Sequence, residues 1–184
     1  MPELPIFITG NQNKADYLSR QMGIPLEHRK LDLIEPQSTD LHEIVKYKLE
    51  QAFEACAQPV LVEDVSLEFN ALNGLPGPYI RWFEDLAGEE ACCRMLDGFN
   101  DRSAVIRCCF GYYDGKEMHF FDSKLHGSIA ASPRGENGFG FDRYFIHDGD
   151  TRTRAEMPQK ENERTYAEQM KPFTKVKEFL NQES

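Results

Sequence analysis

Two adjacent acidic residues, Glu63 and Asp64, directly follow the apolar segment 59–62. Such a continuous run of β-branched residues and leucine is typical of a buried strand, and ligand sites in α/β sheets gather where such strands end. Carboxylates placed there can bind Mg2+ or activate a water molecule. Glu35, in a predicted loop earlier in the chain, could add a third oxygen donor. The alternative is an acidic strand end that simply meets solvent.

A second candidate site is the segment in which a predicted strand meets a predicted helix: Thr9, Gly10, Asn11, Gln12, Asn13 and Lys14. Backbone N–H groups at a helix N-terminus suit an anion, glycine allows close approach of the backbone, and Lys14 adds a positive charge for phosphate. The spacing does not match a Walker motif. An ordinary strand–turn–helix corner is the competing interpretation.

Lys48 lies within the apolar stripe of a predicted helix, among Leu41, Ile44, Val45 and Ala52. A lysine in this place can extend its ammonium group out to solvent beside the core. The functional alternative is a lysine that points into a phosphate site.

Glycine and phenylalanine alternate before an acidic residue in Gly138-Phe139-Gly140-Phe141-Asp142. Phenylalanine can stack on a nucleobase, and backbone amides freed by glycine can recognise a base edge. The competing interpretation is an aromatic core strand.

Strands and helices that would position these residues are mixed along the chain. We predict strands over residues 5–9, 26–33, 59–62, 66–72, 102–113, 116–125, 127–131 and 144–146. Helices are predicted over residues 13–22, from a cap at Thr39 or Asp40 to about 56, and over 78–86, 89–96, 161–170 and 172–180. Asp114-Gly115 predicts a hairpin, which requires antiparallel pairing. No linker interrupts the pattern, so we expect an α/β fold with a mixed sheet and a single domain over residues 1–184.

Composition excludes several classes of protein. A net charge of −10 argues against binding to nucleic acid. No apolar run approaches the ~20 residues of a membrane span, and the first residues lack the pattern of a signal peptide, so we expect no membrane association. The five cysteines show no zinc spacing and predict reduced thiols in a cytoplasmic protein.

Taken together, the motifs resemble the inosine triphosphate pyrophosphatase, or Ham1-like, family. The resemblance rests on residues 9–14, 60–64, 69–83 (FNALNGLPGPYIRWF), 138–142 and 155–158 (AEMP), in the order of the family. It implies an elongated mixed sheet flanked by helices, with two lobes and a central cleft for a nucleoside triphosphate. It also implies a homodimer that hydrolyses noncanonical purine nucleotides such as ITP, dITP and XTP to the monophosphate and pyrophosphate, with Mg2+ as cofactor.

The resemblance also implies a role for each candidate. Residues 9–14 would cradle the triphosphate, and Lys48 would be a second phosphate-binding lysine. Glu35 and Asp64, with Glu63 beside them, would serve the metal, and Asp64 would also activate the attacking water. Phe139, Gly140, Phe141 and Asp142 would hold the base, flanked by Lys160.

The chain departs from the family directly after the acidic pair and, more seriously, at the base-binding end. Val65 replaces a serine or threonine, and Phe141 replaces a frequent tryptophan. The family's Ser-His-Arg motif, whose last two residues grip the 6-oxo group of the purine, falls on residues 165–167 or 166–168, which lack both cations. Lys160 or Arg164 could substitute. Without a substitute we predict weaker or redirected base selection, and the alternative function is a nucleotide-binding protein with weak or lost catalysis.

Overall fold

The computed structural model describes residues 4–10, 12–23 and 25–181, with the backbone alone for Gln12 and Asn13. Its strands are β1 (Ile6–Ile8), β2 (His28–Arg29), β3 (Val60–Phe69), β4 (Pro76–Gly77), β5 (Ser103–Tyr113), β6 (Met118–Ile129) and β7 (Phe145–His147). Its α-helices are α1 (Gln12–Met22), α2 (Leu41–Cys56), α3 (Ile80–Ala87), α4 (Glu89–Arg94), α5 (Gln159–Thr165) and α6 (Phe173–Asn181). Short 3-10 turns are η1 (Asn70–Leu72), η2 (Gly140–Arg143) and η3 (Arg154–Glu156), and a π-helical turn, η4 (Tyr166–Met170), follows α5.

The strands of the described residues form a seven-stranded sheet in the order β2-β1-β3-β5-β6-β7, with β4 paired to β3. β1 runs parallel to both β2 and β3, whereas β3 pairs with β4 and β6 with β7 in antiparallel fashion. The predicted α/β fold with a mixed sheet flanked by helices is therefore confirmed. Every helix of the described chain is too short or too polar to cross a bilayer.

Backbone contacts divide the chain into two compact units. Unit 1 comprises residues 1–64, 108–123 and 171–184, and unit 2 comprises residues 65–107 and 124–170. The single domain over residues 1–184 stays a prediction.

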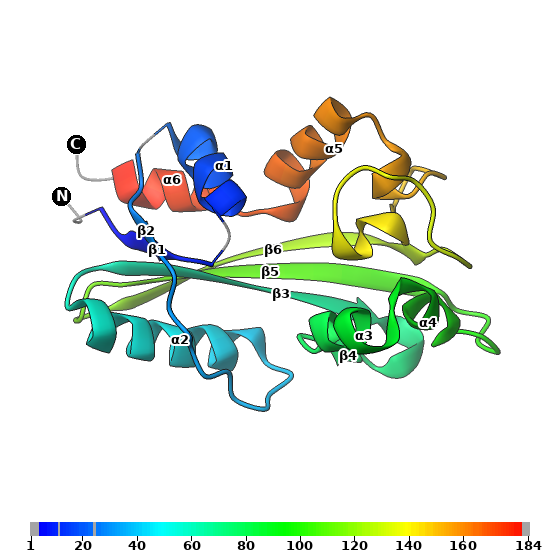
Figure 1. Cartoon of the computed structure of the whole chain (residues 1–184), viewed down its shortest axis with the longest axis horizontal. Helices are drawn as coiled ribbons and strands as arrows, with labels where there is room; N and C mark the ends of the chain where they lie inside the picture. The colour runs from blue at the N-terminus through cyan, green and yellow to red at the C-terminus, as the bar shows by residue number, and fades with distance from the viewer. Residues whose placement is uncertain (1–3, 11, 24, 182–184) are drawn as a thin grey trace. The chain divides into compact units, whose positions relative to one another are not determined.

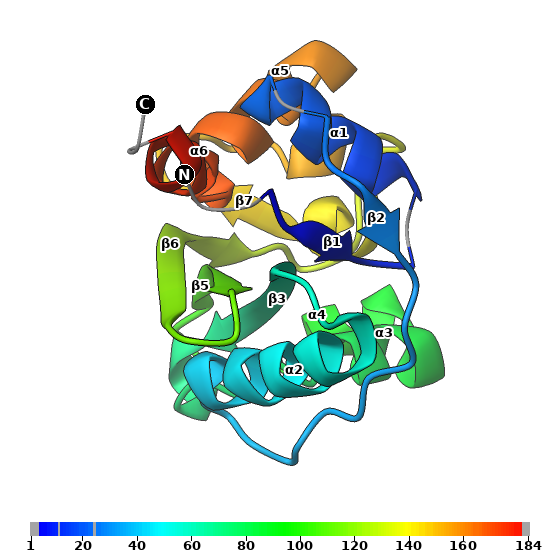
Figure 2. The same cartoon turned by 90° about the vertical axis from the view of Figure 1, so that its left-hand side faces the viewer.

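Unit 1 places β1 between helices (Figure 2), with α1 and α6 side by side on one face and α2 on the other. The first turn of α2 is capped by Asp40, whose carboxylate accepts from the backbone N–H of His42 at 2.9 Å. The apolar face of α2 then packs on β1 and β3 in a core that includes Val45, Leu49 and Val62. This packing fixes the position of Lys48, one residue before Leu49 on the same helix.

Unit 2 packs α3 and α4 together (Figure 1) over a core that includes Phe69, Ile106 and Phe145. All five cysteines are free thiols, as the sequence predicted. Four of them are buried and one is half-buried.

The predicted hairpin is present: β5 and β6 flank Asp114-Gly115, Gly115 has a φ of 88°, and Asp114 Oδ1 accepts from the N–H groups of Lys116 and Glu117 at 2.8 and 2.9 Å.

Strand lengths differ from the prediction in three places. β3 continues through Glu63 and Asp64 to Phe69, because Ser66, Leu67 and Phe69 are buried and keep the strand within the core. β6 likewise passes through Gly127, where a Cβ would lie only 2.2 Å from the Ile146 carbonyl, so glycine lets the neighbouring strand approach. β2 contains only two residues, and the polar segment after it is irregular.

Candidate active site

Two adjacent acids on β3 face opposite sides of the strand in unit 1. Successive side chains of a strand point to opposite faces. Glu63 accordingly contacts Lys14 of α1 and Lys171, just before α6, whereas Asp64 contacts Lys48 of α2. The two carboxylates are therefore neighbours in sequence, but their side chains contact different lysines.

On the α2 side, Lys48 gathers three oxygen acceptors. Its ammonium donates to Glu35 Oε1 at 3.0 Å, to Asp64 Oδ2 at 2.9 Å and to the Glu63 carbonyl at 3.1 Å. Burial by itself lowers the pKa of Lys48, but the charges of Asp64 and Glu35 outweigh it and raise the pKa above its usual value. The lysine is therefore held as a cation, with a carboxylate from a loop and another from a strand on the same nitrogen.

Glu35 owes its place to a side chain one turn beyond Lys48. Gln51 of α2 donates from Nε2 to the Ile34 carbonyl at 2.7 Å and accepts from the Ile34 N–H at 2.9 Å. These two bonds tie the loop to the helix, so that Glu35 reaches Lys48 although its own side chain is half-exposed.

On the α1 and α6 side, Glu63 is buried between two lysines. Lys171, whose side chain is almost fully buried, donates to Glu63 Oε1 and lies 3.6 Å from Cys108 Sγ. Lys14 Nζ is 3.8 Å from the same carboxylate. Burial by itself raises the pKa of Glu63, but the charges of Lys14 and Lys171 lower it to about 2, so the carboxylate is ionised.

The base loop, residues 138–142, lies in unit 2 and forms a 3-10 turn from Gly140 onward rather than the alternative core strand. Gly138 and Gly140 both have positive φ, and Phe139 is 60% exposed. Asp142 is buried, and its Oδ2 accepts from the Phe139 N–H at 3.2 Å, which closes the turn.

Comparison with known proteins identifies the family. The model of the Ham1 family matches residues 5–179 of the chain. The chain belongs to the Ham1 family.

Named relatives agree with this assignment. The inosine triphosphate pyrophosphatase of Yarrowia lipolytica is 41% identical over 180 residues, which cover 95% of this chain and 94% of the relative. The dITP/XTP pyrophosphatase of Saccharolobus solfataricus is 36% identical over 176 residues, 94% of this chain and 91% of the relative.

Solved structures show the same fold. The Staphylococcus aureus Ham1 protein superposes with a TM-score of 0.83 at 25% identity, covering 98% of this chain and 100% of that one. A HAM1 protein from Coxiella burnetii gives 0.81 at 23% identity, covering 97% and 99%.

The predicted site residues of this Ham1 chain separate as follows. The structure brings Glu35, Lys48 and Asp64 together, and brings Glu63 to Lys14 instead. Asn11 and the side chains of Gln12 and Asn13 lie outside the described residues. Lys160 is exposed on α5.

The free protein does not require glycine at position 10. Gly10 has no positive φ, and a Cβ there would meet the Lys30 side chain at an ordinary 3.5 Å. Close approach of a ligand remains the predicted reason for glycine at this position.

The carboxylates on the α2 side suit Mg2+. Glu35 and Asp64 both offer hard oxygen donors, and both contact the same nitrogen of Lys48. Mg2+ usually binds one or two carboxylates of a protein together with phosphate oxygens of the substrate, and these two residues match that number. The carboxylate of Glu63 is engaged by two lysines and faces the other side of the strand.

Sequence reasoning missed Lys171 and a mixed group of possible metal ligands. The donor atoms of His42, Cys109 and Asp122 lie within 4.8 Å of one another. However, His42 Nε2 is already 2.9 Å from both oxygens of Asp122, and burial, with Asp122, raises the pKa of the Cys109 thiol far above its usual value. A metal would need the thiolate, so we assign no metal site there. No sequence spacing marks either group, since each joins segments distant in the chain.

Proposed function

We propose that this chain is a nucleoside triphosphate pyrophosphatase that hydrolyses noncanonical purine nucleotides such as ITP and XTP to the monophosphate and pyrophosphate. The observation that carries the proposal is the convergence of Lys48 with Glu35 and Asp64. A cation beside two carboxylates matches what phosphoryl transfer requires, namely positive charge for the phosphates and oxygen ligands for a metal. The names of the pyrophosphatase relatives supply the substrate class.

In this proposal Lys14 and Lys48 bind phosphate oxygens of the substrate. All three donors of Lys48 have acceptors in the free protein, so substrate binding must exchange at least one of them. Mg2+ held by Glu35 and Asp64 would neutralise negative charge on the phosphates. Glu63 we place outside the metal ligands, because two lysines engage it.

Asp64 is the proposed general base. Its carboxylate accepts a proton from a water molecule whose oxygen attacks the α-phosphorus. The bond between that phosphorus and the oxygen bridging to the β-phosphorus breaks, and pyrophosphate leaves with the electron pair. Phe139, Gly140, Phe141 and Asp142 hold the base, with Phe139 exposed for stacking.

Pyrophosphate release from ITP, XTP, GTP and ATP, with and without Mg2+, tests the proposal. We expect release from ITP and XTP that requires Mg2+. Binding of these nucleotides without release would favour a nucleotide-binding protein with lost catalysis. Release that persists with EDTA present would reject the metal assignment.

The homodimer and the cytoplasmic location implied by the resemblance are part of this proposal. Free cysteines are what a reducing compartment predicts. Light scattering coupled to gel filtration measures the mass of the assembly, and a single-chain mass would contradict the dimer.

A further inference from the structure

A buried guanidinium beside the base loop is only partly paired. Arg154, in η3 of unit 2, is fully buried. Its Nε donates to Asp142 Oδ1 at 2.7 Å. Among the described residues, nothing accepts a hydrogen bond from its buried Nη1 or Nη2. The four N–H groups on these two nitrogens are thus aligned beside a residue of the base loop without an acceptor.

Such an arrangement is costly unless an acceptor arrives. Burying a charge whose donors stay unsatisfied costs the full free energy of its desolvation. Protein interiors therefore nearly always pair these groups. Asp142 supplies one partner and is itself shared with the Phe139 N–H. An acceptor from outside the chain would complete the set.

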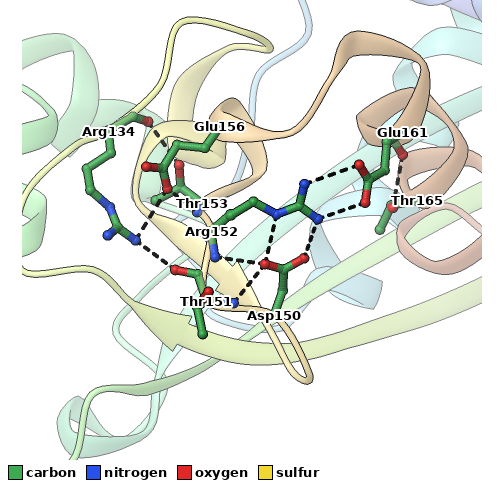
Figure 3. Close-up of polar contacts among 8 residues, drawn as sticks. All are labelled: Arg134, Asp150, Thr151, Arg152, Thr153, Glu156, Glu161 and Thr165. Atoms are coloured by element: carbon green, nitrogen blue, oxygen red, sulfur yellow. Dashed lines mark hydrogen bonds and ion pairs between the residues drawn. The ribbon is translucent and has the colours of Figure 1, made fainter.

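The segment that carries Arg154 is fixed on both sides (Figure 3). Arg152 binds Asp150 at 2.7 Å and Glu161 of α5 at 2.8 Å. Thr153 donates from its hydroxyl to the Arg134 carbonyl at 2.9 Å and from its backbone to Glu156 at 2.7 Å. The bonds of the buried Thr153 hold the backbone next to Arg154, whereas the ion pairs of Arg152 are partly exposed to water and add little. A backbone that is already held lowers the entropy lost on binding a ligand.

The base loop can move around this fixed arginine. Both Nη atoms are buried in the free protein, so a base reaches them only if a neighbouring segment shifts. The base loop, which is bonded to the same arginine through Asp142, is the segment that we expect to move. Gly138 and Gly140 have φ values of 78° and 56°, and glycine crosses between such conformations without a steric penalty.

We propose that Arg154 recognises a carbonyl oxygen of the nucleobase and so replaces the histidine and arginine missing from the C-terminal motif. The inference rests on the proposed function and specifies its substrate as an oxopurine nucleotide. Carbonyl oxygens accept hydrogen bonds, as the guanidinium requires, whereas the 6-amino group of adenine offers further donors. Arg154 thus selects ITP and XTP against ATP, the reverse of what the missing motif alone predicts.

Lys160 and Arg164 are weaker candidates for this role. Both are exposed on α5. Their charges are screened by water, whereas the guanidinium of Arg154 is desolvated and bonded to Asp142.

A substrate lacking the carbonyl tests the inference directly. Pyrophosphate release is measured with ITP and with purine riboside 5′-triphosphate, which lacks the 6-oxo group of ITP and the hydrogen on N1 that accompanies it. We expect kcat/KM of the unaltered protein to be about 10- to 100-fold higher for ITP. In Arg154→Met the ratio should fall toward unity through loss on ITP alone.

Two further variants make the result specific. Arg154→Lys keeps a cation beside Asp142 but loses the planar pair of Nη donors. It should retain only part of the preference for ITP over purine riboside triphosphate. Arg152→Met removes a guanidinium two residues away whose donors are already used by Asp150 and Glu161, and should leave the ratio unchanged.

Each failure has its own signature. If no triphosphate releases pyrophosphate, the proposed function fails. If release occurs and the unaltered protein does not distinguish the two substrates, the inference about Arg154 is overturned while the function stands. A full ratio in Arg154→Met also overturns it. If Arg154→Met does not fold, Arg154→Lys, which keeps a cation beside Asp142, takes its place, and a full ratio in that variant overturns the inference.

Discussion

Lys171 in unit 1 and Arg154 in unit 2 are both buried cations, and their surroundings differ. Lys171 has the Glu63 carboxylate and the Cys108 sulfur as partners, and Glu63 has Lys14 as well. Arg154 has Asp142 at Nε and no acceptor at either Nη among the described residues. A charge paired within the chain holds the structure together, whereas a partly paired charge is available to a ligand. The difference predicts that the two cations respond differently to substitution.

Lys171→Met should cause the largest loss of stability. It leaves the Glu63 carboxylate buried without its nearest cation, and breaking a buried pair costs about 3–5 kcal/mol. Urea unfolding measures the loss, with exposed Lys177→Met on α6 as the matched control. Adding Glu63→Gln to Lys171→Met should recover part of the lost stability.

If Lys171→Met lost no more stability than the control, Lys171 would not stabilise the fold, and the contrast with Arg154 would be wrong. Arg154→Met also breaks a buried ion pair, the one with Asp142, so it should destabilise the protein as well. The ratio of kcat/KM for ITP over purine riboside triphosphate distinguishes the two cations, because it should fall in Arg154→Met and stay unchanged in Lys171→Met.

Substitutions of the two acids of β3, Asp64→Asn and Glu63→Gln, should affect different properties of the protein. Asp64→Asn keeps the shape of the side chain but removes the charge, and turnover should fall roughly 100-fold or more if Asp64 is the general base. Glu63→Gln should instead lower the free energy of unfolding, because Glu63 faces the buried Lys171. Steady-state kinetics and urea unfolding of both variants, with exposed Glu54→Gln as control, measure the contrast. Turnover of Asp64→Asn close to that of the unaltered protein would remove Asp64 from the chemistry.

Lys48→Met should raise the Michaelis constant and lower turnover, together by about 10-fold or more in kcat/KM, since a charge-assisted bond to phosphate is lost. It should also destabilise the protein by about 1–3 kcal/mol, because the bonds from Lys48 to Asp64 and Glu35 are lost. A lysine that only covered an apolar face would keep or raise stability on the same change. Lys46→Met, exposed on the same helix, is the control, and an unchanged rate for Lys48→Met would return Lys48 to a structural role.

Local patterns predicted much of the fold but only part of the candidate site. The cap at Asp40, the periodicity of α2 and the Asp114-Gly115 hairpin depend on neighbours in sequence, and each is present. The motif of residues 60–64 located Asp64, but treating Glu63 and Asp64 as one group overlooked the alternation of side chains along a strand that continues to Phe69.

The residues that sequence reasoning missed are defined by distant partners. Lys171 meets Glu63 from 108 positions away, and no local pattern indicates that contact. Arg154 is twelve positions from Asp142 and looks like an ordinary polar loop residue next to the AEMP segment. Burial and missing acceptors, which only the folded chain provides, distinguish it from Arg152.

Arg152→Gln should give the smallest effect and sharpens the comparison within one loop. Arg152 is partly exposed, and its ion pairs with Asp150 and Glu161 are screened by water, so its loss should cost less than about 1 kcal/mol in thermal or urea unfolding. The ratio of kcat/KM for ITP over purine riboside triphosphate should not change, because all of the pairing that Arg152 makes is internal to the loop and α5. If Arg152→Gln lowered that ratio as much as Arg154→Met does, base selection would depend on the geometry of segment 150–156 as a whole. The free donors of Arg154 would then not be its source.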